Sequence, residues 1–199
     1  MPHHTPDIAA LIGSRICHDL ISPVGAVANG MELLQLAGGG VGPEITLISD
    51  SAANANARIR LFRLAFGVAS EDQMIATEEI RGILSAIYAG SRILLDWQVS
   101  GSVPRREARA AMLAILCAEH ALPFGGKLSV GRTGAHWRIG AEAPRLRPDP
   151  ALWDILAGAQ AAPDLPPSAV QFLLLPQDLS AMGRTCTTKH GQEAIELGF

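Results

Sequence analysis

The chain has 199 residues, of which 48% are hydrophobic, enough to bury the core of one domain or two small ones, and this excludes a wholly disordered chain. Its 16 basic and 19 acidic residues give a formal net charge of −3 without a basic stripe, so we expect no nucleic-acid partner. Residues 1–13 lack the features of a signal peptide and the longest apolar run, 110–118, is too short to span a bilayer, so we expect a cytoplasmic protein without membrane contact.

A long first helix is predicted from Asp7 to about Leu36. From its middle onward, apolar residues recur at spacings of 4, 3, 4 and 3, a heptad-like seam that indicates packing against another helix. The seam consists of Leu20, Val24, Val27, Met31 and Leu34. Pro23 lies inside the helix, where it removes one main-chain hydrogen bond and is expected to bend or open the helix locally.

A second helix is predicted from Pro43 to about Phe66, after a glycine-rich break over residues 37–42. Proline suits the first position of a helix, and Glu44 then places a negative charge in the first turn, where the helix dipole favours it. The spacing of the apolar positions alternates between 3 and 4, at Ile45, Ile48, Ala52, Ala55, Ile59, Phe62 and Phe66.

Together these two helices predict an antiparallel helical hairpin, assigned to residues 1–70, that is incomplete on its own. Each helix can cover one apolar seam of the other, which leaves the rest of their apolar surface in water. Pairing with a second copy into a four-helix bundle covers that surface, so a homodimer is the favoured interpretation. The alternative is that the seam packs on the C-terminal half of the same chain.

Residues 71–199 predict a second domain made of short alternating helices and strands. Helices are expected from Thr77, as a cap, to Ile87, at 104–122, at 149–156 after an Asp149 cap, and at 168–182, interrupted at Pro176 and with a strand over 172–175 as the alternative. Strands are expected at 92–99, at 127–132 and 136–141 as a hairpin, and on both sides of His190-Gly191. The fold class is therefore α+β: a long helical hairpin plus a small α/β sandwich with helices over a sheet.

The segment Cys17-His18-Asp19-Leu20-Ile21-Ser22-Pro23 carries the chemistry. At about 100° per residue, His18 points roughly 160° away from the seam, toward solvent. Asp19 can hold one ring nitrogen as N–H and leave the other as a nucleophilic lone pair, and Ser22 can hydrogen-bond a transferred group or a water. The same-face neighbours are mostly small, namely Ser14, Arg15, Ser22, Gly25 and Asn29. The plainer alternative is that His18 is only a solvated helix residue.

The run from His18 to Pro23 resembles the H-box of two-component histidine kinases, His-(Glu/Asp)-Leu-x-(Ser/Thr)-Pro, at all five defined positions. The whole chain resembles more closely the alphaproteobacterial ChpT-type histidine phosphotransferases, which join such a hairpin to a kinase-like ATP-binding domain that has lost ATP binding. The resemblance implies that His18 accepts a phosphoryl group from the aspartate of one response-regulator receiver domain and passes it to the aspartate of another. Asp19 and Ser22 assist as the other two catalytic residues.

The same resemblance implies the partners. Receiver domains, a hybrid kinase as donor and response regulators as acceptors, dock on the first helix at Arg15, Ser22, Pro23, Gly25, Ala26 and Asn29. Magnesium belongs to the acidic pocket of the receiver, so we expect no metal and no cofactor on this chain.

Departures from the kinase pattern favour phosphotransfer over kinase activity. If the helix at 104–122 is the one that carries the magnesium-binding asparagine of kinases, that position falls near Cys117, a poor ligand for magnesium. No Asp-x-Gly-x-Gly box follows, and residues 163–184 contain Gly183 as their only glycine. A residual ATP-dependent histidine kinase and a non-enzymatic dimeric scaffold that binds response regulators remain as alternative functions.

Other polar residues are predicted to be structural. The thiol–imidazole pair Cys117 and His120 is expected in a core helix, the segment Arg105-Arg106-Glu107-Ala-Arg109 on a solvated face, and His3-His4 at the chain end without a metal. His136 and His190 have no predicted partner. The cysteines are spaced too widely for a Cys-x-x-Cys pair and are expected to be buried, small hydrophobic residues of a reducing compartment, at Cys17, Cys117 and Cys186.

Overall fold

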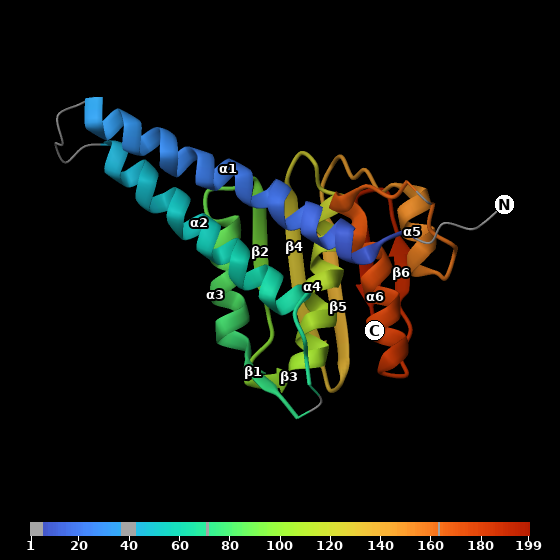
Figure 1. The fold of residues 1–199 in the computed structure, drawn as a ribbon. Coiled ribbons are helices and arrows are strands. Elements are labelled where there is room, and N and C mark those ends of the chain that lie inside the picture. Colours follow the sequence, from blue (N-terminus) through green and yellow to red (C-terminus); the bar gives the residue numbers. More distant parts are fainter. Residues whose placement is uncertain (1–5, 37–42, 71, 163) are drawn as a thin grey trace.

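A computed structural model of the chain describes residues 6–36, 43–70, 72–162 and 164–199. Two long antiparallel helices, α1 (Ile8–Leu36) and α2 (Pro43–Ala65), form the predicted hairpin, and about half of its length projects beyond the rest of the molecule (Figure 1). The glycine-rich break at 37–42 and the pair His3-His4 lie outside the described residues. In the described part of the chain, no helix is both long and apolar enough to cross a membrane.

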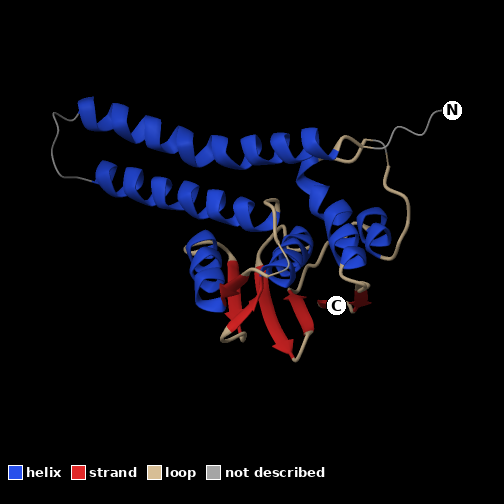
Figure 2. Ribbon diagram, turned by 60° about the horizontal axis from the view of Figure 1, so that its bottom comes forward, coloured by secondary structure: helices blue, strands red, loops and turns tan. Residues whose placement is uncertain are grey.

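The rest of the chain is a mixed five-stranded sheet with helices on one face (Figure 2). The strand order is β2-β4-β5-β7-β6, and β2 and β4 are parallel while the other neighbours are antiparallel. The strands are β2 (Ile93–Trp97), β4 (Gly126–Thr133), β5 (His136–Glu142), β6 (Thr187–His190) and β7 (Ala194–Gly198). The helices are α3 (Thr77–Tyr88), α4 (Arg105–His120), α5 (Pro150–Leu156), the 3-10 turn η1 (Pro167–Ala169) and α6 (Val170–Ala181).

Helix α4 is the centre of the core. Every side chain from Ala110 to Ala118 is buried, because α4 packs on β4, β5 and β7 on one side and on α2 and α6 on the other. A helix covered on all sides must be apolar on all sides, which explains this longest apolar run of the sequence. The prediction that Cys117 lies in a core helix is confirmed, since its thiol is buried. His120 on the same helix is half-buried.

The apolar seam of α1 is divided between two environments. The part of α1 before the seam packs on η1 and α6, and within the seam Leu20 is partly buried against the core. Farther along, Val24 and Met31 are 56% and 44% exposed, because α2 is the main neighbour of α1 in the described part of the chain and covers one side of it. A periodic apolar pattern shows that a face is covered but not which neighbour covers it.

Three local predictions are wrong. Thr77 does not cap α3: it is the first residue of the helix, buried, and its hydroxyl donates to the Gly101 carbonyl at 2.9 Å. That carbonyl is brought there by an unpredicted two-stranded sheet, β1 (Met74–Ala76) and β3 (Ser102–Pro104). Helix α6 runs through Pro176 without interruption and has no strand, because its apolar side chains pack on α4 and α5. Cys17 is exposed rather than buried.

The charged segment at the start of α4 is also not a solvated face. Glu107 is buried and accepts hydrogen bonds from the Trp137 indole at 2.9 Å, from Arg132 at 3.0 Å and from Arg184 at 2.9 Å. Burial acts to raise the pKa of Glu107, but the hydrogen bonds from Trp137, Arg132 and Arg184 outweigh it and lower the pKa below its ordinary value. This carboxylate therefore ties β5, the end of β4 and the segment after α6 to the central helix.

We expect Glu107→Gln to lower the free energy of unfolding by about 2–3 kcal/mol at pH 7, because charge-assisted hydrogen bonds lose their acceptor. A carboxyl with a lowered folded-state pKa stabilises the fold above its unfolded pKa and loses that contribution as the pH falls through the folded value. The difference between wild type and variant should therefore shrink in acid. Urea unfolding at neutral and acidic pH measures it, with the exposed Glu193→Gln as control. An equal loss at both pH values contradicts the assignment.

Candidate functional site

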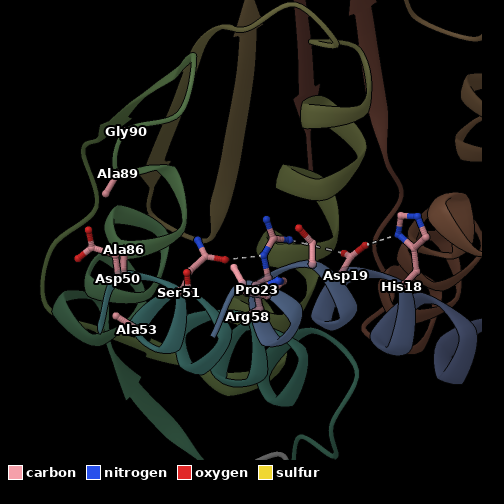
Figure 3. A pocket seen from close by; sticks show the side chains of 13 residues that line it. His18, Asp19, Pro23, Asp50, Ser51, Ala53, Arg58, Ala86, Ala89 and Gly90 are labelled. Atoms are coloured by element: carbon pink, nitrogen blue, oxygen red, sulfur yellow. Dashed lines mark hydrogen bonds and ion pairs between the residues drawn. The ribbon is translucent and has the colours of Figure 1, made fainter. Parts of the chain in front are cut away.

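His18 lies in the middle of α1 with its side chain 82% exposed, as the helical wheel predicts. Its ring is turned toward Asp19, and Nδ1 lies 3.1 Å from the Oδ1 atom of that carboxylate (Figure 3). When Nδ1 donates its proton to Asp19, Nε2 carries the free lone pair. The arrangement is that of an accessible imidazole nucleophile whose second nitrogen is anchored.

Asp19 is itself held in place from α1 and α2. Its Oδ2 atom accepts a hydrogen bond from Arg15 Nε at 2.7 Å and lies 3.8 Å from Arg58 Nη1. Arg58 in turn donates to the Asn54 amide oxygen at 2.9 Å. Figure 3 shows the Asp19 carboxylate between His18 and Arg58, with an interaction to each. The carboxylate that orients His18 is therefore fixed by two guanidinium groups, one turn earlier on α1 and on the neighbouring helix.

A cleft of about 820 Å³ opens beside His18, between the two helices of the hairpin and the C-terminal end of α3. Its lining is dominated by small side chains, and among the described residues that line it Arg58 is the one arginine or lysine. The lining residues are His18, Asp19, Ser22, Pro23, Ala26, Asp50, Ser51, Ala53, Asn54, Arg58, Ala86, Ala89 and Gly90. A surface of this kind can admit a protruding element of another protein close to the imidazole.

The predicted site residues of α1 do not all share one environment. His18, Asp19, Ser22, Pro23 and Ala26 line the cleft, whereas Gly25 and Asn29 are exposed on α1 outside that lining. Pro23 is buried as part of the cleft wall. Arg15 is 14% exposed and bonded within the chain, to Asp19 and to the Ser168 carbonyl of η1.

Sequence reasoning missed the contributions of α2 and α3 to this cleft. Asn54 and Arg58 stand one turn apart on α2, at positions i and i+4, and that spacing was the available signal for a polar pair on one helix face. Ala86 of α3 and the residues directly after that helix, Ala89 and Gly90, carry no polar side chain and gave no signal at all.

A second acidic group faces the site from α4. The Tyr88 hydroxyl donates to the Glu119 carboxylate at 3.0 Å. Burial raises the pKa of Glu119, while the hydrogen bond from Tyr88 and the positive charges of Arg15 and Arg58 act to lower it. Burial and the neighbouring Glu119 also raise the pKa of Tyr88 well above its ordinary value. The two guanidinium groups therefore stand near a second carboxylate as well as near Asp19.

Two observations concern the predictions made from the sequence about metal and nucleotide binding. In the described ranges of the chain, no three His, Cys, Asp or Glu side chains are grouped so that they could hold a metal ion. Cys117, at the position expected for a magnesium-binding asparagine, is 0% exposed in the core, and burial raises the pKa of its thiol well above the ordinary value.

Comparison with known proteins gives consistent matches. Residues 77–194 match the family model of the histidine phosphotransferase C-terminal domain. The chain is 36% identical over 166 residues to protein phosphotransferase ChpT of Brucella abortus (strain 2308). This alignment covers 80% of this chain and 78% of that protein. A solved bacterial phosphotransferase superposes with a TM-score of 0.80 at 30% identity, over 96% of this chain and 95% of the other.

Proposed function

We propose, from the premise that this chain belongs to the histidine phosphotransferase family, that His18 is the residue that carries the phosphoryl group. Histidine phosphotransfer in a phosphorelay is the function of the chain, as its family and its phosphotransferase relatives establish. The observation that supports His18 is its geometry: an exposed imidazole with Nδ1 anchored at 3.1 Å on a carboxylate that is itself fixed.

The geometry supports the following transfer step. The Nε2 lone pair of His18 attacks the phosphorus of a receiver aspartyl phosphate, the N–P bond forms, and the P–O bond to the aspartate breaks with its electron pair leaving on the carboxylate. The proton on Nδ1 stays hydrogen-bonded to Asp19, which balances the positive charge that develops on the ring. In the second half-reaction, a carboxylate of another receiver attacks the phosphohistidine and Nε2 leaves with the electron pair. Because the transition state is loose, positioning and charge neutralisation supply most of the catalysis.

Receiver domains are the proposed partners, with a hybrid kinase as donor and response regulators as acceptors, in the cytoplasm expected from the sequence. The docking surface extends from Ser22 and Ala26 in the cleft to Gly25 and Asn29 on the exposed face of α1. Small side chains there allow the receiver's aspartate to approach His18 closely, and a relay between several clients suits a small, transient interface. Magnesium is supplied by the receiver, and this chain itself uses no cofactor.

The site test is to locate the phosphoryl group. The protein is incubated with a radiolabelled phospho-receiver, isolated and digested. We expect one labelled peptide, spanning His18, whose label is lost in acid and retained in alkali, as for a phosphoramidate. A label on another peptide, or an alkali-labile acyl phosphate, contradicts the assignment of His18 while leaving the family's function intact.

A homodimer is also proposed, and the support for it is the set of large apolar residues of the hairpin that are exposed in the single chain. They are Ile21, Val24, Met31, Leu33, Leu36, Ile45, Leu47 and Ile59. These exposed apolar side chains lie on more than one face of the helices, and a second hairpin would cover those of one face, such as Val24 and Met31, by forming a four-helix bundle.

We expect the double variant Val24→Glu, Met31→Glu to weaken dimerisation at least a hundredfold, because two charges enter an apolar interface. Sedimentation velocity across micromolar concentrations measures it. Val68→Glu, at an exposed apolar residue after α2, is the control and should leave the dimer intact. A wild-type protein that sediments as a monomer, or a double variant that dimerises normally, contradicts the bundle.

The chain is further proposed to lack ATP-dependent kinase activity, because Cys117 lies buried in apolar surroundings where a kinase holds magnesium. We expect titration calorimetry with Mg-ATP to give no binding heat at concentrations of protein that bind a receiver. Saturable binding of one nucleotide per chain favours the alternative of a residual kinase.

A further inference from the structure

Arg15 connects the site on α1 with the second domain. Its Nε atom donates to Asp19 at 2.7 Å, and its Nη1 atom donates to the main-chain carbonyl of Ser168, 153 residues further along the chain. The buried Gln171 side chain of α6 donates to the same carbonyl at 2.9 Å, which fixes its position. One guanidinium therefore bridges the carboxylate beside His18 and a fixed point of the second domain.

The bridge depends on the shape of arginine. A guanidinium presents donors in several fixed directions and can serve two acceptors at once, whereas the ammonium of lysine is a single point charge. With only 14% of its side chain exposed, Arg15 has little surface to offer a docking receiver. The structure thus gives Arg15 a role inside the chain, different from the partner contact that the sequence predicts.

The charges around Asp19 explain why it needs this bridge. Asp19 is largely buried, and the positive groups that face it are Arg15 from α1 and Arg58 from α2, while Glu119 from α4 faces both guanidinium groups. Without Arg15, the Asp19 carboxylate loses its shortest hydrogen bond and keeps only the longer contact with Arg58 at 3.8 Å. It is then free to turn toward water and away from the His18 ring.

We propose that Arg15 is a positioning residue, through which the Ser168 carbonyl of the second domain fixes Asp19 and thereby the Nδ1–H tautomer of His18. The inference rests on the proposed role of His18 and adds a task for the second domain, which is proposed above to lack kinase activity. The second domain holds the phosphoryl acceptor in its reactive form. It does so through a chain of contacts from Ser168 to Arg15, Asp19 and the imidazole.

The test reads the His18 tautomer directly in the unphosphorylated full-length protein, by long-range proton–nitrogen NMR with nitrogen-15-labelled histidine. The spectrum of His18→Gln identifies the His18 signals. We expect protonated Nδ1 and unprotonated Nε2 in the wild type. In Arg15→Ala the population should shift toward protonated Nε2, because the other ring nitrogen has lost its fixed acceptor. Arg60→Ala, at an exposed arginine of α2 paired with Glu79, is the matched control and should resemble the wild type.

Transfer kinetics with a phospho-receiver supply the second readout. We expect Arg15→Ala to lower the maximal transfer rate by about tenfold or more, as is typical when the outer partner of a functional histidine is removed. The receiver concentration at half-maximal rate should change less than about threefold. Arg15→Lys keeps the charge and the aliphatic stem, so it remains folded should Arg15→Ala unfold. The lysine side chain can reach only one of the two acceptors, so we expect Arg15→Lys to show a smaller shift toward protonated Nε2 than Arg15→Ala.

Two results overturn the proposal. The first is an unchanged His18 tautomer in both Arg15→Ala and Arg15→Lys. The second is a raised receiver concentration at half-maximal rate with an unchanged maximal rate, which would make Arg15 a docking residue. Failure of the proposed function is distinguishable, because a wild-type protein that takes no label at His18 still reports its tautomer by NMR.

Discussion

His18→Gln is expected to lower the rate of phosphoryl transfer from a phosphorylated receiver by at least about a thousandfold, because the reaction loses its nucleophile. Glutamine is a good helix former and remains polar, so α1 and the exposed position should tolerate it. The rate is measured by the appearance of label on the protein and its loss from the receiver. His136→Gln, at another exposed histidine on β5, is the matched control and should transfer at the wild-type rate.

Receiver binding separates this prediction from the scaffold alternative. We expect His18→Gln to bind unphosphorylated receivers within about threefold of the wild-type affinity, since the rest of the docking surface is unchanged. Label that reaches His18→Gln as fast as wild type contradicts the role of His18 and favours another acceptor residue, whereas the scaffold alternative predicts that neither protein takes label.

Gly25→Arg is expected to abolish productive docking while leaving the fold intact or more stable. A side chain at Gly25 meets no atom within 4 Å, and glycine inside a helix is less favourable than arginine by about 0.5–1 kcal/mol. The long side chain then stands on the surface proposed for the receiver, only about 20° around the helix from the His18 direction and about two turns further along it. A displacement of about 1 Å between reacting groups is enough to reduce the rate about a hundredfold, and we expect at least that loss.

The matched control for this variant lies on the same helix. Gly13→Arg also enters open space on α1, but its side chain points roughly 140° away from His18. Transfer rate, receiver affinity by calorimetry and thermal unfolding are measured for both. Transfer at the wild-type rate in Gly25→Arg, or an equal loss in both variants, contradicts the proposed docking face.

Local patterns made the centre of the site predictable. The exposure of His18, its contact with Asp19 and the two helices of the hairpin all depend on residues within one or two turns, and the helical period relates those directly. The α4 core helix and the β4–β5 hairpin are equally visible, because their apolar runs are set off by glycine and proline. The family resemblance then added the chemistry that periodicity alone does not specify.

Long-range partners explain what could not be predicted. The role of Arg15 depends on Ser168, and the burial of Glu107 depends on Trp137 and Arg184, all distant in sequence. A helical wheel places such charged residues on the surface, because it represents one helix in water without the distant segments that pack on it. Thr77 shows the same effect on a smaller scale, since its hydroxyl donates to the carbonyl of Gly101, 24 residues further along the chain.

The central claim is that a phosphoryl group passes through His18 between two receivers, and a two-step relay tests it most directly. The protein is labelled by a phospho-receiver, freed of that donor, and mixed with a second, unlabelled receiver. We expect label to move through the wild type, to be acid-labile while it resides there, and to fail to reach the second receiver when His18→Gln is used. Label that reaches the second receiver equally well through His18→Gln contradicts the account.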